Sequence, residues 1–229
     1  EGLSPSAMNE YLESPPTFFA RRVLRLHEPE APATAIGIAV HAGIAEYLTT
    51  KDQDKAYGAL NRCLKNSLLP RNAAYERVVE HATLSLKAYL ASAHKDGETT
   101  AIEKAYSVKR MVEGKEILLY GKVDAVFNAP TGECIVDFKT STDVHIKDEK
   151  HARQLAFYDL LLKENGHDLK AASIVQVGPE LVREFPVPLT AETRAELIVT
   201  LDAVISELLS GTWRAGEPSD YDDLLTLFV

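Results

Sequence analysis

The chain has 229 residues, of which 45% are hydrophobic and 26% charged, and its formal net charge is −9 at pH 7. This composition is typical of a globular protein with a sizeable core, and the length suits one large domain. The acidic balance argues against a basic protein that coats nucleic acid, but it leaves room for a nuclease, whose metal ligands are themselves acidic. The two cysteines, Cys63 and Cys134, exclude a disulfide scaffold and suit a cytoplasmic location. No apolar run reaches the roughly 18 residues that span a membrane.

The chain is predicted to begin with two short helices. Ser4 can cap the first of them, with Pro5 at its first helical position, and the Ser-Pro-Pro run at 14–16 starts the second. Three arginines make the second helix basic: Arg21, Arg22 and Arg25. They form either a solvated face over a buried stripe or a contact for phosphate groups.

Residues 34–48 are predicted to form an alanine-rich helix that is apolar almost all round and therefore buried. His41 and Glu46 stand out within it. Taken alone, a buried histidine is either a hydrogen-bonded core residue or a metal ligand. Two amphipathic helices, 52–66 and 72–95, follow without residues that indicate chemistry.

A strand at 100–112 and a hairpin over 120–140 are predicted to form three antiparallel strands, with the hairpin turn at Pro130–Gly132. Each hairpin strand has an acid where a core-facing strand should be apolar: Asp124 in the first and Asp137 in the second. Lys139 follows Asp137 at a spacing of two, so both side chains lie on one face of the strand.

Two carboxylates on one hairpin predict a site for a divalent metal. Mg²⁺ and Mn²⁺ prefer hard oxygen ligands, and the backbone carbonyl of Phe138 could add a third oxygen to those of Asp124 and Asp137. Lys139 could orient or deprotonate an attacking water, or neutralise a pentavalent phosphorane. A histidine ligand would favour Mn²⁺ somewhat over Mg²⁺.

The remaining elements are a polar connector at 143–150, a helix at about 149–164, two strands at 172–178 and 181–187, and a helix at 191–209 capped by Thr190. Gln154 and Tyr158 lie one helical turn apart and share a face. The sequence therefore predicts an α/β or α+β fold with a mixed sheet of about five strands, flanking helices and a helical N-terminal half. We expect one domain over residues 1–229, with a helical part at 1–98, a catalytic sheet core at 99–190 and a C-terminal helix and tail at 191–229.

The pattern resembles the PD-(D/E)xK nuclease superfamily, and within it the RecB-type exonuclease branch. That branch has, in chain order, Gly-x-x-x-His on a helix, a strand with a Glu, Gly-x-x-Asp, Asp-x-Lys and Gln-x-x-x-Tyr. The matching residues here are Gly37 with His41, Glu103, Gly121 with Asp124, Asp137 with Lys139, and Gln154 with Tyr158. The N-terminal stretch 3–15 is also similar, so the resemblance covers about residues 3–190 and implies a restriction-endonuclease-like core.

The resemblance implies a metal site with three ligands, which are His41, Asp124 and Asp137, and a catalytic Lys139. Glu103 would stand behind the ligands or bind a second metal. Gln154 and Tyr158 would position the substrate or order the lysine, although Tyr158 can equally be a core aromatic. The DNA backbone would be held by cations of the arginine helix, the connector and the following helix: Arg21, Arg22, Arg25, Lys147, Lys150 and Arg153.

Several relatives hold a [4Fe–4S] cluster with four cysteines, one of them just before the proline that Pro15 matches. Here Ser14 stands at that position, and residues 190–229 contain no cysteine, so we expect no iron–sulfur cluster. No helicase ATP-binding loop is present either. The expected protein is a Mg²⁺- or Mn²⁺-dependent DNA exonuclease of a bacterial or phage-infected cell. It is either free-standing, as in phage recombination and repair, or the nuclease module of a helicase–nuclease.

Its expected partners are DNA ends or single strands, with a helicase or a single-strand annealing or binding protein as a further candidate. Nothing in the sequence fixes the oligomeric state. Two rival functions remain open: a catalytically inactive DNA-binding or scaffold module with the same fold, and a metallohydrolase of small phosphoesters.

Overall fold

A computed structural model describes residues 2–26, 28–140, 149–214 and 221. The elements in chain order are β1 (Gly2–Leu3), α1 (Pro5–Glu13), α2 (Pro15–Phe18) with a π-helical continuation (Phe19–Val23), α3 (Pro32–Thr50), α4 (Gln53–Asn66), α5 (Ala73–Ala91) with a short 3₁₀ turn (Ala93–Asp96), β2 (Glu98–Val112), β3 (Lys115–Ala129), β4 (Gly132–Lys139), α6 (Glu149–Glu164), β5 (Leu169–Val177), β6 (Val182–Val187) and α7 (Ala191–Ser210).

The expected mixed α/β fold is confirmed. The strands form one mixed sheet in the order β1-β3-β4-β5-β6, with β2 paired to β3. β4 and β5 are parallel, and α6 provides the helical crossover that a parallel pair requires. The described sheet has six strands rather than about five, because the two residues of β1, too few to give a sequence pattern, pair with Leu118 and Leu119 of β3.

β3 is the strand on which the sheet is built. Along one edge it pairs with β2 from Lys115 to Asn128. Along its other edge β1 pairs at 118–119 and β4 at 125–129. Within the described part of the chain, this second edge therefore has no strand partner at residues 120–124.

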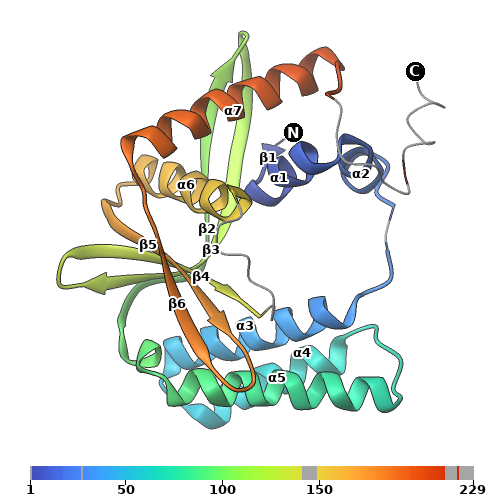
Figure 1. Cartoon of the computed structure of the whole chain (residues 1–229), viewed down its shortest axis with the longest axis vertical. Helices are drawn as coiled ribbons and strands as arrows, with labels where there is room; N and C mark the ends of the chain where they lie inside the picture. Colours follow the sequence, from blue (N-terminus) through green and yellow to red (C-terminus); the bar gives the residue numbers. More distant parts are fainter. Residues whose placement is uncertain (1, 27, 141–148, 215–220, 222–229) are drawn as a thin grey trace.

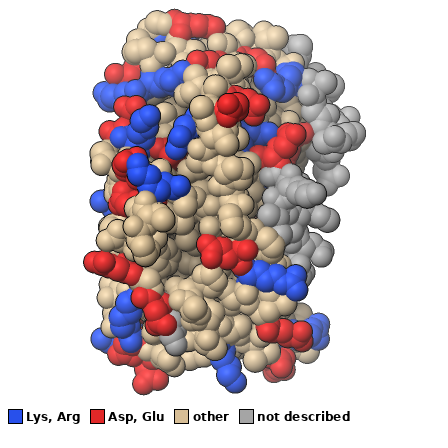
Figure 2. Space-filling model, turned by 60° about the vertical axis from the view of Figure 1, so that its left-hand side comes forward, with Lys and Arg blue, Asp and Glu red and all other residues tan. Residues whose placement is uncertain are grey.

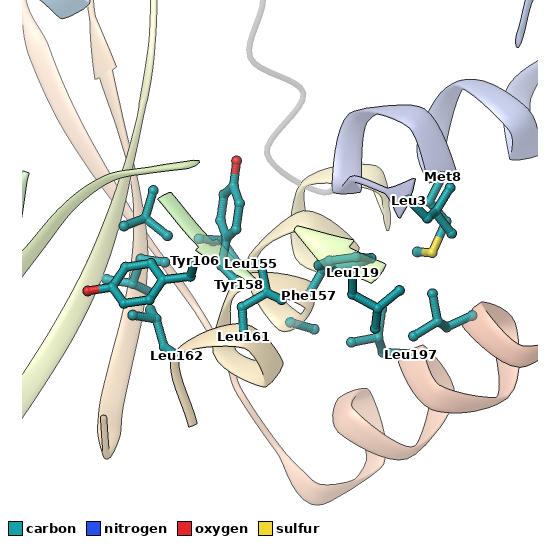
Figure 3. Close-up of a cluster of buried hydrophobic side chains, with 14 of the residues drawn as sticks. Leu3, Met8, Tyr106, Leu119, Leu155, Phe157, Tyr158, Leu161, Leu162 and Leu197 are labelled. Atoms are coloured by element: carbon teal, nitrogen blue, oxygen red, sulfur yellow. The ribbon is translucent and has the colours of Figure 1, made fainter. Parts of the chain in front are cut away.

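Helices cover both faces of the sheet (Figure 1). Helices α3, α4 and α5 pack on one face around Val136, Phe138 and Val175. Helices α1, α6 and α7 pack on the other face around a second buried cluster that includes Leu155, Phe157 and Leu197 (Figure 3). The sheet thus separates two hydrophobic cores.

Local sequence explains where the helices begin. Ser4 caps α1 by accepting a hydrogen bond from the amide of Ala7 (3.2 Å), and Thr190 caps α7 in the same way from Thr193 (3.2 Å). Helix α5 ends at Ala91, four residues before the predicted end, because the chain there turns into the 3₁₀ segment. No helix in the described ranges is both long and apolar enough to cross a membrane.

The prediction that the helix at 34–48 is buried all round is only half right. One side of α3 packs on α4 and α5, where a Cβ on Gly43 would lie 2.7 Å from Leu86 Cδ2. The other side is open, and Ile38 there is 54% exposed. The apolar composition of the open side is explained by the cavity that it lines.

Candidate metal centre and active site

The hairpin acids lie where β3 and β4 separate. The last residue pair between these strands is Ala125 with Val136. Beyond it the amide of Phe138 donates to Asp124 Oδ2 (2.8 Å), so a side chain takes the place of the strand partner. Because the N–H and C=O of one strand residue point to the same side, the Phe138 carbonyl also faces β3. The Phe138 carbonyl would have to point to this side to serve as the metal ligand that the sequence predicts.

Three elements bring His41, Glu103 and Asp124 together. His41 Nδ1 of α3 lies 3.4 Å from Asp124 Oδ1 of β3 and 3.9 Å from Glu103 Oε1 of β2. One ligand atom from each residue lies within 4.8 Å of the other two. Ligands about 2.1 Å from a divalent ion in octahedral geometry fit within such a separation. An imidazole with two carboxylates is a donor set suited to Mn²⁺ or Mg²⁺, so the residues fit the metal that the sequence predicts.

Glu103 reaches this cluster through an unusual backbone. Its φ is +47°, in the left-handed region that a non-glycine residue seldom adopts. Its neighbours Ile102 and Lys104 pair with Ala125 and Val123, which places Glu103 opposite Asp124. Strained residues of this kind concentrate at functional sites. Glu103 also forms an ion pair with Lys122 of β3.

Asp137 belongs to a second, adjoining network rather than to the three-residue cluster. Its Oδ2 lies 2.7 Å from Lys139 Nζ, and its Oδ1 accepts a hydrogen bond from Gln154 Nε2 (3.1 Å). Lys139 Nζ also donates to Gln154 Oε1 (3.2 Å), and Gln154 Nε2 donates to Tyr158 Oη (3.2 Å). The four residues come from β4 and α6, and Gln154 links the acid to the lysine.

Burial and neighbouring charges act in opposite directions on the two acids. Burial raises the pKa of Asp137 to about 6, and the charge of Asp124 adds to the rise although Lys139 opposes it. Burial also disfavours the charged form of Asp124, but the charge and hydrogen bond of His41 and the Phe138 amide outweigh it and lower the pKa. The two acids therefore titrate in different pH ranges, and Asp137 takes up a proton first as the pH falls below about 6.

His41 and Tyr158 complete the electrostatics of the site. Burial disfavours the charge of His41, yet the carboxylates of Asp124, Asp137 and Glu103 outweigh it and raise the pKa of His41. Burial raises the pKa of Tyr158, so its hydroxyl stays protonated. The carboxylates of the site thus favour a proton on His41, and Lys139 adds a positive charge beside Asp137.

Two glycines of the motif have visible roles in the packing. A Cβ on Gly121 would lie 2.9 Å from Tyr158 Cε1, so only glycine allows the tyrosine ring to pack here against β3. A Cβ on Gly37 would lie 3.3 Å from Thr140 Oγ1, at the end of β4. These glycines allow α6 and α3 to approach the strands that bear the acids.

A cavity of about 640 Å³ opens in front of the metal cluster. It is lined by the open side of α3, including Thr34, Ile38 and His41, and by Lys122 and Asp124 of β3. Lys122 is not among the predicted site residues. It lies at this cavity because it is two residues before Asp124 on β3, so both side chains lie on the same face of the strand. That spacing of two was the signal that could have identified it.

The predicted DNA-binding cations that the structure describes are mostly paired with acids or amide groups. Arg21 pairs with Glu10 (2.9 Å) and Glu28 (2.6 Å), and Arg22 pairs with Glu10 (2.8 Å). Arg25 is exposed with a φ of +55°. On the face in Figure 2, acidic and basic side chains of the described residues are interspersed.

The remaining predicted cations lie near the start of α6. Arg153 donates to Asn9 Oδ1 (2.8 Å), and Lys150 lies 3.5 Å from Glu13. Lys150 and Arg21 line a cavity of about 510 Å³ that also contains Gln154. Lys147 lies outside the described residues.

The mixed sheet with paired acids and a lysine at its interrupted strand edge is the core of a restriction-endonuclease-like nuclease. The family model of the PD-(D/E)XK nuclease superfamily matches residues 2–220, and the chain belongs to this superfamily. Its class is therefore that of a phosphodiester-cleaving enzyme that acts on nucleic acid, in a family that uses divalent metals.

Solved structures agree with this fold. A provisionally named exonuclease from Eubacterium rectale superposes with a TM-score of 0.64 at 14% identity, over 99% of this chain and 88% of that one. The structure of SSO0001 has a TM-score of 0.40 at 17% identity, over 88% of this chain and 84% of that one, which is too distant to add to the argument. No curated protein sequence matches the chain.

Proposed function

We propose that this nuclease is a metal-dependent DNA exonuclease of the RecB-type branch, acting on DNA ends or single strands. The observation that carries the proposal is the meeting of two networks at the separation of β3 and β4. One is the donor set of His41, Glu103 and Asp124, and the other holds Lys139 against Asp137. The first network requires residues from three distant parts of the chain, the second joins β4 to the following helix α6, and both match the order of the motif.

The ligands of the metal in this proposal are His41, Asp124 and Asp137, with the Phe138 carbonyl and Glu103. A divalent ion, when bound there, would supply an activated water and stabilise charge on the phosphate. Asp137 would have to be ionised to act as a ligand, and its raised pKa means that binding would release a proton from it at and below about pH 6. His41 would likewise bind in its neutral form.

Lys139 is proposed to be the catalytic cation. Its ammonium has three N–H donors, of which Asp137 and Gln154 take two, so one remains for a water or a phosphate oxygen. Gln154 fixes the direction of the ammonium, and Tyr158 in turn holds Gln154. Gln154 and Tyr158 are therefore positioning residues in this scheme. The DNA backbone would be held by Arg21, Arg22, Arg25, Lys147, Lys150 and Arg153.

The whole of residues 1–229 is proposed to act as one nuclease domain without an iron–sulfur cluster. Mn²⁺ and Mg²⁺ are the proposed cofactors, the site of action is the bacterial or phage-infected cytoplasm, and the protein works alone or beside a helicase or a single-strand annealing protein. The imidazole ligand is the basis for expecting Mn²⁺ to support activity at least as well as Mg²⁺.

The test is to incubate the protein with end-labelled linear DNA and with covalently closed circular DNA, each with Mn²⁺, Mg²⁺ or EDTA. Wild type should degrade linear DNA only with metal and leave the closed circle intact. Asp137→Ala and Lys139→Ala should lose activity by at least a hundredfold, whereas Lys170→Ala, an exposed lysine on the neighbouring strand β5, should retain it. Equal activity of wild type and both site variants would refute the assignment, and cleavage of the circle would identify an endonuclease.

Two alternatives are separated by simpler measurements. A catalytically inactive DNA-binding or scaffold module would bind no Mn²⁺ in a calorimetric titration near neutral pH. A hydrolase of small phosphoesters would cleave a chromogenic phosphodiester, and added DNA would not compete with that activity.

A further inference from the structure

The outward face of β3 continues from the metal cluster toward a second cavity. Lys122 and Tyr120 precede Asp124 by two and four residues, so the three side chains share one face of the strand. A strand rises about 3.3 Å per residue, which places Tyr120 about 13 Å along the strand from Asp124. Tyr120 is 43% exposed, although the neighbouring Leu119 is completely buried.

The second cavity, of about 480 Å³, lies beside Tyr120, and Lys122 lines both it and the first cavity. Its polar lining includes Ser6, Arg22 and Lys122, and its aromatic lining consists of Tyr106, Tyr120 and Tyr158. Tyr158 also contacts Gln154, so the cavity reaches the network that holds Lys139. A hollow with two cations, hydroxyls and an aromatic ring has the chemistry that recognises a nucleotide unit.

The ring of Tyr120 is held in place from behind. A Cβ on Gly2 of β1 would lie 2.9 Å from two of its ring carbons, so the glycine backbone packs directly against one side of the ring. The rest of the ring remains exposed at the cavity. An exposed ring that is already fixed loses little conformational entropy when a base stacks on it.

The two cations of the cavity are held by acids that a phosphate could replace. Lys122 pairs with Glu103, and Arg22 pairs with Glu10 (2.8 Å). Both cations are well exposed, with 59% and 43% of their side-chain surface accessible. Each acid keeps a second partner, since Glu10 also pairs with Arg21 (2.9 Å) and Glu103 lies 3.9 Å from His41, so a phosphate can take over the cation without leaving a carboxylate unpaired.

We propose that Tyr120, Lys122 and Arg22 form a subsite for an unpaired nucleotide of the DNA strand that is cut. Tyr120 stacks on its base, and the two cations neutralise the adjoining phosphates. In a duplex both faces of each base are covered by neighbouring pairs, so this subsite selects single-stranded or frayed ends. The inference rests on the proposed DNA nuclease function and adds a preferred strand state to it.

The test measures binding without cleavage, by fluorescence anisotropy in EDTA, with a labelled single-stranded oligodeoxynucleotide and a labelled blunt duplex whose terminal base pairs are covalently cross-linked so that the ends cannot fray. Tyr120→Ala should weaken single-strand binding about 5- to 100-fold, the usual effect of removing one stacked base contact. Tyr120→Phe should bind within about threefold of wild type, because the ring remains. Duplex binding should be unchanged in both variants.

Leu118→Ala is the matched control, since Leu118 shares the face of β3, is 41% exposed and lies one pleat farther from the metal cluster. It should bind like wild type. If Tyr120→Ala binds single strands like wild type, or if Leu118→Ala is equally impaired, the stacking subsite is refuted while the nuclease function stands. An equal loss of duplex binding in Tyr120→Ala would refute the selection of unpaired strands. If wild type binds neither DNA in EDTA, the subsite is refuted, and the cleavage assay with Mn²⁺ or Mg²⁺ decides the nuclease function separately.

Discussion

Replacing Asp137 by asparagine should stabilise the metal-free protein. Asp137 is only 4% exposed, and its folded-state pKa of about 6 lies above its ordinary value of 3.8. A raised pKa makes the folded state bind the proton more tightly, so the acid's contribution is fully present below about pH 4 and is lost as the pH rises through about 6. A shift of about two units corresponds to about 3 kcal/mol at neutral pH. Asparagine is uncharged and does not incur this loss, and the gain is reduced only by the one hydrogen bond that its NH2 group cannot accept from Lys139 or Gln154.

The measurement is urea denaturation in EDTA at several values between about pH 4 and pH 8. Wild type should lose stability relative to Asp137→Asn across about pH 4 to 6, and the variant should be more stable by about 1–3 kcal/mol at pH 7. Asp159→Asn is the control, because Asp159 is equally buried but is held by two hydrogen bonds from Arg194 (2.6 and 3.2 Å). It should be destabilised. A destabilised Asp137→Asn at pH 7, or parallel pH profiles for it and wild type, would refute the reasoning.

Three further predictions concern the two networks. Glu103→Gln should keep the fold and weaken Mn²⁺ binding in calorimetry by about tenfold or more, since a neutral amide replaces a carboxylate of the donor set; unchanged affinity would remove Glu103 from the site. Gly121→Ala should destabilise the protein by about 1–3 kcal/mol in urea, because the new Cβ meets the Tyr158 ring at 2.9 Å; Gly114→Ala, with open space around it, is the comparison for a general glycine effect, although its φ of +75° adds strain of its own. Tyr158→Phe should retain stability within about 1 kcal/mol and lower the turnover rate with little change in KM, as expected when a positioning hydroxyl is lost; unchanged turnover would leave Tyr158 as a core aromatic only.

The sequence was most informative where several residues of one element share a direction. The alternation along the hairpin correctly predicted that Asp137 and Lys139 meet, and the helical spacing placed Gln154 beside Tyr158. Element boundaries followed capping residues such as Thr190. These relations depend only on the residue spacing within one strand or one helix, which can be read from the sequence.

Relations between elements could not be predicted in the same way. The left-handed backbone of Glu103 has no local signal, because the chain there reads as an ordinary strand. The sequence also did not indicate that Gln154 of α6 binds Asp137 beside the His41 cluster, which depends on where β3 and β4 separate. The open side of α3 was missed because apolar residues that line a cavity have the same composition as buried ones.

The position of the site between two hydrophobic cores has a mechanical consequence. His41 is anchored in the helical layer on one face of the sheet, and Gln154, which holds Asp137, belongs to the layer on the other face. An ion coordinated by both His41 and Asp137 would link the two helical layers through the sheet. The free energy of metal binding would then stabilise the packing of both layers on the sheet. The protein would be most rigid with metal bound, which is the state in which it can cut its substrate.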